Sequence, residues 1–345
     1  MSVILRQNVR LGAYTTMGIG GPARWFAEAR SEQDVLDAMH LAAQKNVPLY
    51  VLGGGSNLLV PDAGYAGMVL LMSLEGIERD GGRYDVAAGE NWDAFVQQTV
   101  EAECAGIECL AGIPGSVGGT PVQNVGAYGQ DVSETIESVR VFDRVRCVFV
   151  EMSASECRFR YRRSVFNTEE PGRYIVTRVR FSLRPNAAPS LKYADVKKRF
   201  EGQPTPTLAE VADAVRGIRR GKGMLIVAGD PESRSAGSFF RNPVVAAEEI
   251  AGIAAVAGEP EDEVPTYPAG VEGRVKLAAA WLMERTGFVK GYGEGRVGIS
   301  SRHTLAIVNR GQATFSDLER FEREIVDAVQ KKFGVRLERE PVVLR

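Results

Sequence analysis

The sequence contains little histidine and cysteine and has no long apolar run. Its 345 residues include 2 His and 4 Cys, and the cysteines at positions 104, 109, 147 and 157 form no C-x-x-C pair. This scarcity argues against a metal site and against a Cys/His or Ser/His catalytic pair, so we predict no bound metal. No apolar run reaches the roughly 20 residues of a membrane span, and the apolar stretch after Met1 is too short for a signal peptide. We therefore expect a cytoplasmic protein with no membrane partner.

Charge of one sign is also missing. Lys and Arg number 42 and Asp and Glu 44, giving a net charge of −2, so the chain has no global field that would attract nucleic acid. A hydrophobic content of 44% and a charged content of 25% are ordinary for a globular protein. At roughly 100 to 200 residues per domain, we expect two or three domains whose partners are small molecules.

Local patterns predict several helices and strands. Ser31 caps an expected helix through about Lys45, and Thr207 caps another. Further helices are expected over 91–103 and 275–285, and over a final stretch that opens at the capping box Ser316–Glu319 and ends at Gly334. Strands are expected over 49–52, 138–142, 147–152 and 174–183, and the segment 184–189 resembles a linker.

Two glycine-rich loops stand out. Gly53–Gly55, followed by Ser56 and Asn57, comes after a strand and continues as extended chain, so it is neither a Rossmann fingerprint nor a P-loop, because both open a helix. The segment 112–129 carries six glycines and two prolines and is too broken for regular structure. Backbone N–H groups in such loops can form nests for phosphate oxygens, so the two loops together favour a dinucleotide.

Three further segments contain polar side chains in a suggestive order. A strand over 157–166 would place Arg158, Arg160 and Arg162 on one face, either as an anion site or as a solvated basic face. The stretch 235–243 crowds small residues before two aromatic ones, which indicates a tight turn or a close approach to a ligand. Extended chain near the C-terminal end would put Glu338 and Glu340 on one face, where they are either solvated or available for acid–base chemistry.

From about Thr15 to Glu340, the chain resembles the UDP-N-acetylenolpyruvoylglucosamine reductase family, type I. The resemblance rests on six segments in order: 52–58 (LGGGSNL), 88–92 (AGENW), 113–119 (IPGSVGG), 123–129 (QNVGAYG), 161–166 (YRRSVF) and 237–243 (GSFFRNP). It implies an α+β fold in which a two-part FAD-binding module of the vanillyl-alcohol-oxidase/cresol-methylhydroxylase type covers about 15–185. The implied parts are subdomains 1–75 and 76–188 and a substrate-binding domain over 189–345.

The resemblance also implies site residues. Non-covalent FAD would contact the glycine loops and their neighbours: Gly53, Gly54, Gly55, Ser56, Asn57, Leu58, Gly89, Ile113, Pro114, Gly115, Ser116, Gly118, Gly119, Asn124, Gly126 and Ala127. The sugar-nucleotide substrate would contact Tyr193, Lys222 and Asn242. After Lys222 the chain is longer than in some relatives, and after Glu340 it has Pro341 and Val342 where some have a valine and an arginine, so these local contacts are open.

The implied reaction passes a hydride from NADPH to FAD and then to the enolpyruvyl ether of UDP-N-acetylglucosamine enolpyruvate, which yields UDP-N-acetylmuramate for peptidoglycan. Arg162, with Glu340, would stabilise the enolate-like intermediate, and Ser238 would supply the proton. One alternative is another flavoenzyme on the same module, such as an oxidase that tethers FAD through histidine, but neither His40 nor His303 lies in a glycine loop. A second is a non-catalytic nucleotide-binding module, which should have lost the catalytic side chains.

Overall fold

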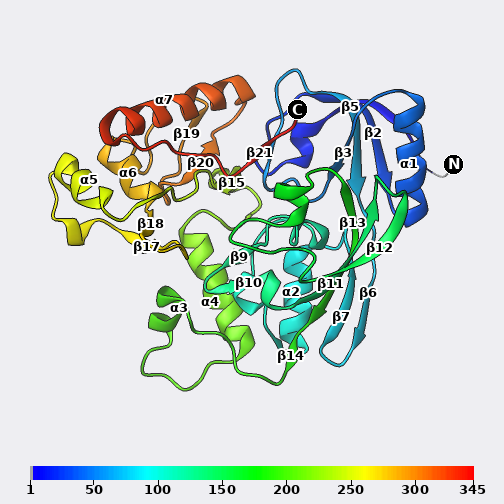
Figure 1. Cartoon of the computed structure of the whole chain (residues 1–345), viewed down its shortest axis with the longest axis horizontal. Coiled ribbons are helices and arrows are strands. Elements are labelled where there is room, and N and C mark those ends of the chain that lie inside the picture. Colours follow the sequence, from blue (N-terminus) through cyan, green and yellow to red (C-terminus); the bar gives the residue numbers. More distant parts are fainter. Residues whose placement is uncertain (1–2) are drawn as a thin grey trace. The chain divides into compact units, whose positions relative to one another are not determined.

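The computed structural model describes residues 3–345, which fold into two compact units (Figure 1). Unit 1 contains the described residues up to Val9, together with 23–55 and 65–220. Unit 2 contains residues 10–22, 56–64 and 221–345. Among the described residues, no helix has both the length and the apolar character needed to cross a membrane.

Unit 1 begins with a four-stranded sheet in the order β1-β2-β5-β3, in which β2, β5 and β3 run parallel. The strands are β1 (Arg6–Arg10), β2 (Pro22–Ala29), β3 (Leu49–Leu52) and β5 (Tyr65–Met72). Helix α1 (Glu32–Gln44) connects β2 to β3. The Ser31 hydroxyl accepts a hydrogen bond from the Asp34 N–H at 3.2 Å, so the predicted cap is confirmed.

A second sheet in unit 1 is antiparallel throughout, in the order β12-β11-β13-β7-β6. Its strands are β6 (Ile77–Asp80), β7 (Arg83–Ala87), β11 (Ile136–Asp143), β12 (Val148–Ser153) and β13 (Tyr174–Ser182). Helix α2 (Trp92–Glu101) packs aromatic side chains against it, with the Phe95 and Phe181 ring centroids 5.2 Å apart. The strands predicted over 138–142, 147–152 and 174–183 are confirmed.

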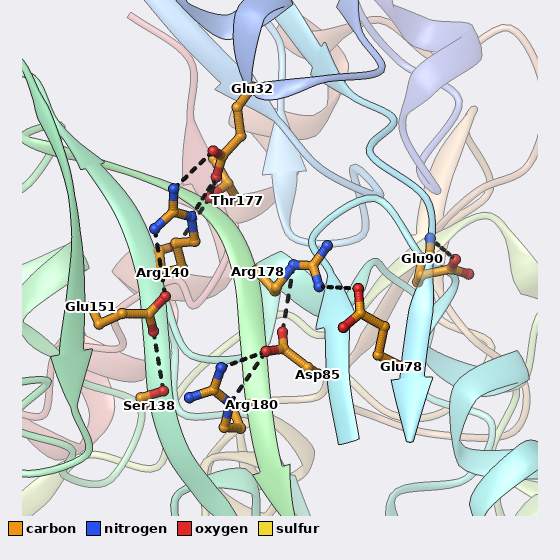
Figure 2. Close-up of polar contacts among 11 residues, drawn as sticks. Glu32, Glu78, Asp85, Glu90, Ser138, Arg140, Glu151, Thr177, Arg178 and Arg180 are labelled. Carbon is orange, nitrogen blue, oxygen red and sulfur yellow. Dashed lines mark hydrogen bonds and ion pairs between the residues drawn. The ribbon is translucent and has the colours of Figure 1, made fainter. Parts of the chain in front are cut away.

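One face of this second sheet carries a ladder of charged side chains (Figure 2). Arg140 on β11 makes two hydrogen bonds to Glu32 of α1, at 2.7 and 3.0 Å, and Thr177 donates to the same carboxylate at 2.8 Å. On the next strands, Arg180 pairs with Asp85 at 2.6 Å. The ladder therefore joins α1 to the sheet through charge-assisted hydrogen bonds.

Within the described residues, the remaining elements of unit 1 are two short strand pairs, two helices and several single-turn helices. Two-stranded pairs are formed by β8 (Cys104–Ala105) with β14 (Arg184–Pro185) and by β9 (Gly126–Ala127) with β10 (Gln130–Asp131). The expected linker 184–189 therefore begins as a strand. The helices are α3 (Ala194–Arg199) and α4 (Leu208–Gly221). The short helices of both units are η1 (Leu11–Tyr14), η2 (Glu108–Leu110), η3 (Val117–Gly119), η4 (Val132–Glu134), η5 (Val165–Glu169), η6 (Pro231–Ser233) and η7 (Glu261–Glu263).

Residues 189–220, which the sequence resemblance assigns to the C-terminal domain, lie in unit 1. The reason is the packing of α4. Arg216 pairs with Asp93 at 2.8 Å, and the Arg219 Nε atom donates to the Gly112 carbonyl at 3.0 Å. The predicted limits 1–75, 76–188 and 189–345 remain a proposal for functional domains, whereas the compact units follow from this packing.

Unit 2 contains two three-stranded antiparallel sheets, in the orders β15-β20-β19 and β16-β18-β17, and a two-stranded parallel pair, β4-β21. The strands are β4 (Leu58–Leu59), β15 (Ser235–Ser238), β16 (Val244–Ala246), β17 (Thr266–Pro268), β18 (Arg274–Leu277), β19 (Val297–Ile299), β20 (Ala306–Asn309) and β21 (Val342–Val343). The helices are α5 (Glu249–Ala257), α6 (Ala279–Arg285) and α7 (Phe315–Phe333). A separate apolar core fills this unit.

Two helix predictions need correction here. The expected helix over 275–285 begins only at Ala279, because residues 274–277 pair with β16 and β17 as a central strand. The final helix is capped by Thr314, whose hydroxyl accepts the Asp317 N–H at 3.1 Å, and not by Ser316. Because the helix begins after Thr314, the Phe315 side chain is buried in the apolar core. The predicted end of this helix at Gly334, with a φ of +72°, is confirmed.

Candidate functional site

The first glycine loop connects β3 to β4, and its glycines lie against the second loop within unit 1. An ideal Cβ atom on Gly54 would lie 2.5 Å from the Cα atom of Gly115. One on Gly53 would lie 2.7 Å from the Ser116 hydroxyl. Only residues without a side chain allow this approach, so the structure brings the two predicted loops together.

The second loop is anchored to α2 and to the sheet. The Trp92 N–H donates to the Gly115 carbonyl at 3.1 Å. A Cβ atom on Gly118 would meet the Ala88 Cβ at 2.5 Å, and one on Gly89 would meet the Leu74 N atom at the same distance. Gly89 and Gly118 are therefore needed for close packing of the loop. Ile113, Pro114 and Gly119 are not fully buried.

The loops contain hydrogen-bonding groups that the protein does not use. The Ser116 hydroxyl is buried and has no hydrogen-bond partner within residues 3–345. Across the same range, the N–H groups of Gly53–Gly55 donate to no other protein group. Adjacent backbone donors and a hydroxyl in a glycine cradle suit the oxygens of a pyrophosphate, so these residues fit the phosphate part of FAD.

Arg162 lies at the tip of a tight turn. The N–H groups of Arg160 and Arg163 each donate to the carbonyl of the other, at 2.9 and 3.0 Å. Between them, Arg162 has a φ of +56°, and its side chain is 22% exposed. The predicted strand over 157–166 is wrong, because Arg158 and Arg162 are both left-handed, and the three arginines share no strand face.

The Arg162 guanidinium faces the loop 124–127. Its Nη2 atom donates to the Gly126 carbonyl, its Nη1 atom donates to the Asn124 carbonyl at 3.4 Å, and Asp131 lies 3.8 Å away. A Cβ atom on Gly126 would collide with the Asp131 carboxylate, so a larger residue here would force the Asp131 side chain to move. Ala127 continues the loop as part of β9. A predicted catalytic cation is therefore held against predicted FAD-binding residues.

Asn124 has a structural task within this loop. Its φ is +43°, its Nδ2 atom donates to the Arg160 carbonyl at 3.1 Å, and its Oδ1 atom accepts from the Ser133 N–H at 3.1 Å. The residue is only 3% exposed. Its side-chain amide therefore ties the glycine loop to the turn that carries Arg162.

Tyr193 also belongs to unit 1. Its ring meets the Tyr128 ring edge-on, with centroids 5.2 Å apart, and is 38% exposed. The segment before it is held by the buried Glu108 carboxylate, which accepts the Ser190 N–H at 2.7 Å. Burial and the charge of Glu108 raise the pKa of the adjacent Cys109 thiol to about 12, so this thiol is not a nucleophile at neutral pH.

In unit 2, Ser238 and Glu340 lie on paired segments. Ser238 ends β15, and the carbonyl of the next residue, Phe239, accepts the Glu340 N–H at 2.8 Å. The Asn57 side chain donates to the Glu340 carbonyl at 3.4 Å, and the Asn57 carbonyl accepts the Val342 N–H at 2.9 Å. The end of the first glycine loop, Ser56–Leu58, is thus joined to the segment that carries Glu340.

The two other predicted substrate residues of unit 2 have identifiable surroundings. The Asn242 side chain accepts the Ala279 N–H at 3.0 Å at the start of α6, which fixes its amide. Lys222 is half-buried. Burial, together with the cations of Lys222 and Lys290, lowers the pKa of His303 to about 4, so His303 is neutral at pH 7.

The predicted residues therefore fall into two groups. Unit 1 brings together the glycine loops, Asn124, Gly126 and Arg162, and unit 2 brings together Asn57, Ser238 and Glu340. The sequence did not single out Asp131, and no local motif marks it as a neighbour of Arg162. His303 was considered there only as a possible flavin tether.

Two family models match the chain. Residues 23–145 match an FAD binding domain, and residues 230–344 match the UDP-N-acetylenolpyruvoylglucosamine reductase C-terminal domain. The predicted α+β fold class, an FAD-binding module followed by a C-terminal domain, is therefore confirmed.

Relatives of similar length carry the same name. UDP-N-acetylenolpyruvoylglucosamine reductase from Thermobifida fusca is 45% identical and covers 100% of this chain and 99% of its own. The protein of that name from Streptomyces avermitilis is also 45% identical, over 97% of this chain and 93% of its own. The crystal structure of UDP-N-acetylenolpyruvylglucosamine reductase from Thermus caldophilus matches with a TM-score of 0.68 at 28% identity, over 100% of both chains.

Proposed function

Because the chain belongs to the UDP-N-acetylenolpyruvoylglucosamine reductase family, we propose that this FAD-dependent oxidoreductase reduces UDP-N-acetylglucosamine enolpyruvate to UDP-N-acetylmuramate. NADPH is the hydride donor, and the product serves peptidoglycan synthesis in the cytoplasm. The partners are these small molecules, and FAD is held without a covalent bond.

One observation carries the proposal, namely the pairing of the Ser238 and Glu340 segments. The hydrogen bond from the Glu340 N–H to the Phe239 carbonyl places a hydroxyl and a carboxylate on neighbouring stretches of backbone. Reduction of a carbon–carbon double bond needs a proton donor as well as a hydride source. A module that only bound nucleotides would have no reason to keep this pair.

The glycine loops would hold the cofactor. The backbone donors of Gly53–Gly55 and the Ser116 hydroxyl would bind pyrophosphate oxygens. Held by these residues, FAD would supply the hydride-transfer chemistry between NADPH and the terminal carbon of the enolpyruvyl group. The protein contributes position, charge and a proton.

Arg162 is assigned to charge stabilisation. Hydride addition to the enolpyruvyl double bond places negative charge on the adjacent carbon and its carboxylate. A guanidinium is always protonated and can donate two parallel hydrogen bonds, which suits a developing carboxylate-stabilised enolate. Its side chain is 22% exposed, so water screens its charge only partly.

Ser238 is assigned as the proton donor, and Glu340 assists Arg162. The Ser238 hydroxyl would protonate the carbon next to the substrate carboxylate, after which the alkoxide regains a proton from solvent. An alkoxide is a poor resting state, so nearby cations must stabilise it while it exists. Tyr193 would cover the bound substrate, Lys222 would bind its diphosphate, and Asn242 would make a further contact.

The test separates the two half-reactions. Purified protein reconstituted with FAD is made anaerobic, and its visible spectrum is recorded before and after NADPH. UDP-N-acetylglucosamine enolpyruvate is then added. The flavin band should bleach with NADPH and return with the enolpyruvyl substrate.

Two other outcomes contradict the proposal. If the band bleaches but returns only when oxygen is admitted, the enolpyruvyl compound is not the hydride acceptor. The chain is then an oxidase built on the same FAD-binding module. If FAD does not bind after reconstitution, the flavin-dependent reaction is excluded.

A further inference from the structure

Arg162 owes its position to a backbone conformation that an arginine seldom adopts. Its φ of +56° lies in the left-handed region, where the Cβ atom crowds the following carbonyl. Such a conformation persists only where neighbouring groups fix it, and it is often found where a side chain must point in one direction. Two sets of hydrogen bonds hold Arg162 in this conformation.

The hydrogen bonds of the turn itself are the first constraint. Arg160 and Arg163 exchange two backbone hydrogen bonds, and Arg162 is the residue between them with positive φ. This pairing closes the turn but does not engage the Arg162 carbonyl. The Arg163 N–H belongs to the peptide after Arg162, so the pairing holds one edge of that peptide and leaves the other edge, the Arg162 carbonyl, for another group to hold.

Asn167 supplies that group. Its Nδ2 atom donates to the Arg162 carbonyl at 3.2 Å, and its Oδ1 atom accepts the Ser164 N–H at 2.9 Å. One planar amide therefore bridges the residues on both sides of Arg163. Asn167 lies in the π-helical turn Val165–Glu169, and such turns are often associated with functional sites.

The π-helical turn is itself anchored in the glycine loop. The Ser164 hydroxyl donates to the Val122 carbonyl at 2.6 Å, and Ser164 is 2% exposed. The Asn124 Nδ2 atom donates to the carbonyl of Arg160, the residue at which the turn begins, at 3.1 Å. The Asn124 amide thus binds the carbonyl of Arg160 at the start of the turn, and the Asn167 amide binds the carbonyl of Arg162 near its end.

We infer that Asn167 is a positioning residue for Arg162, in that its amide fixes the left-handed backbone that aims the guanidinium at the Gly126 carbonyl and at the substrate. This inference rests on the proposed function, in which Arg162 stabilises the enolate-like intermediate. Asn167 touches neither substrate nor cofactor in this scheme. It acts only through the backbone of Arg162.

The test uses Asn167→Ala and Asn167→Asp in the FAD-loaded protein. Reoxidation of the reduced flavin by UDP-N-acetylglucosamine enolpyruvate should slow by about 10- to 100-fold in both variants, which is the usual cost of a small misplacement of a reacting group. Reduction by NADPH should keep its wild-type rate. Asn167→Asp retains the acceptor for Ser164 but loses the donor to Arg162, so a wild-type rate in this variant would overturn the inference.

A double-mutant cycle separates positioning from a general loss of structure. In an Arg162→Ala background, Asn167→Ala should cause no further slowing, because the group that it positions is gone. An equal slowing in both backgrounds would mean that Asn167 acts elsewhere. The matched control is Asn46→Ala, which removes an exposed asparagine with a φ of +50° at the end of α1. It should leave both half-reactions unchanged.

A crystal structure of Asn167→Ala gives a readout that does not depend on the reaction. The Arg162 φ should leave the left-handed region, and the guanidinium should leave the Gly126 carbonyl. If both stay in place, the inference fails even where the enzyme turns over. If the wild-type flavin is not reoxidised by the enolpyruvyl substrate, the proposed function fails, and this structure still decides whether Asn167 positions Arg162.

Discussion

Gly54 and Gly115 approach so closely that a Cβ atom on Gly54 would lie 2.5 Å from the Gly115 Cα atom. Real Cβ atoms essentially never come this close to another heavy atom, and the obstacle is backbone, so one loop must move. The two glycines belong to the two loops that we assign to FAD. Their mutual approach therefore sets the spacing of the backbone donors.

Gly54→Ala should abolish stable FAD binding. The added methyl group pushes the loops apart and misaligns the N–H groups that would hold the pyrophosphate. The measurement is the ratio of flavin to protein absorbance after reconstitution and gel filtration. Gly217→Ala is the control, since a Cβ there meets nothing within 4 Å and the residue lies inside α4. The control should retain FAD and gain about 0.5–1 kcal/mol of stability.

Ser238→Ala should affect only one half-reaction. Reduction of the flavin by NADPH involves no proton from Ser238 and should stay close to the wild-type rate. Reoxidation by the enolpyruvyl substrate should slow by about 100-fold or more, which is the usual contribution of a general acid. Rapid-mixing absorbance measures both steps in the same variant. Equal slowing of the two steps would remove Ser238 from this role.

Asp143 should make folding sensitive to acid. Hydrogen bonds from Arg173, at 2.8 and 3.1 Å, lower the pKa of Asp143 to about 2. An unfolded aspartate has a pKa of about 3.9, so the unfolded state binds the proton more tightly. The stabilisation is fully present above about pH 4 and is lost as the pH falls towards 2.

The check compares urea unfolding of the wild type and Asp143→Asn between pH 2 and pH 7. The stability difference should be largest at neutral pH and should shrink below about pH 4. A difference that does not change with pH would show that the carboxylate charge is not the cause.

Glu32 and Arg140 should be energetically coupled. Burial alone would raise the pKa of Glu32, but the hydrogen bonds from Arg140 and Thr177 outweigh it and hold the pKa below the usual value. Each side chain of the pair is 33% exposed, so we expect a coupling of about 1 kcal/mol, at the upper end for such pairs. A double-mutant cycle with Glu32→Gln and Arg140→Gln measures it by chemical unfolding. The more exposed pair Arg30–Glu28 should give a coupling near zero, and a larger coupling there would contradict the argument.

Sequence reasoning worked where the signal was local. Ser31 caps α1 because its hydroxyl, three residues from Asp34, needs nothing beyond the first helical turn. The pattern over 275–277 predicts helix, but it is too short to distinguish the helical period from the period of a strand. Pairing with β17, the preceding strand, and with the more distant β16 decides the conformation of this segment, and neither partner lies within the local pattern.

In the candidate site, too, local motifs were informative and contacts between segments were not predicted. The family motifs predict that the glycine loops bind FAD and that Arg162, Ser238 and Glu340 are catalytic, and these assignments stay predictions. The motifs did not predict that Arg162 would be left-handed. The Arg160–Arg163 pairing closes the turn around it, and the Asn167 amide, in the following π-helical turn, holds its carbonyl. Nor did the motifs predict that the Asn124 side-chain amide would make hydrogen bonds to the Arg160 carbonyl and the Ser133 N–H.

The pairing of β4 with β21 has a consequence for synthesis on the ribosome. Leu58 is translated early, but its strand partner is Val342, which lies 284 positions later in the chain (342 − 58 = 284). At about 5–20 residues per second, the segment 56–64 waits on the order of tens of seconds for its neighbours. Unit 1 ends at residue 220, so it can fold while unit 2 is still being made. During that interval the apolar Leu58 and Leu59, which are buried in the finished unit, lack their strand partner.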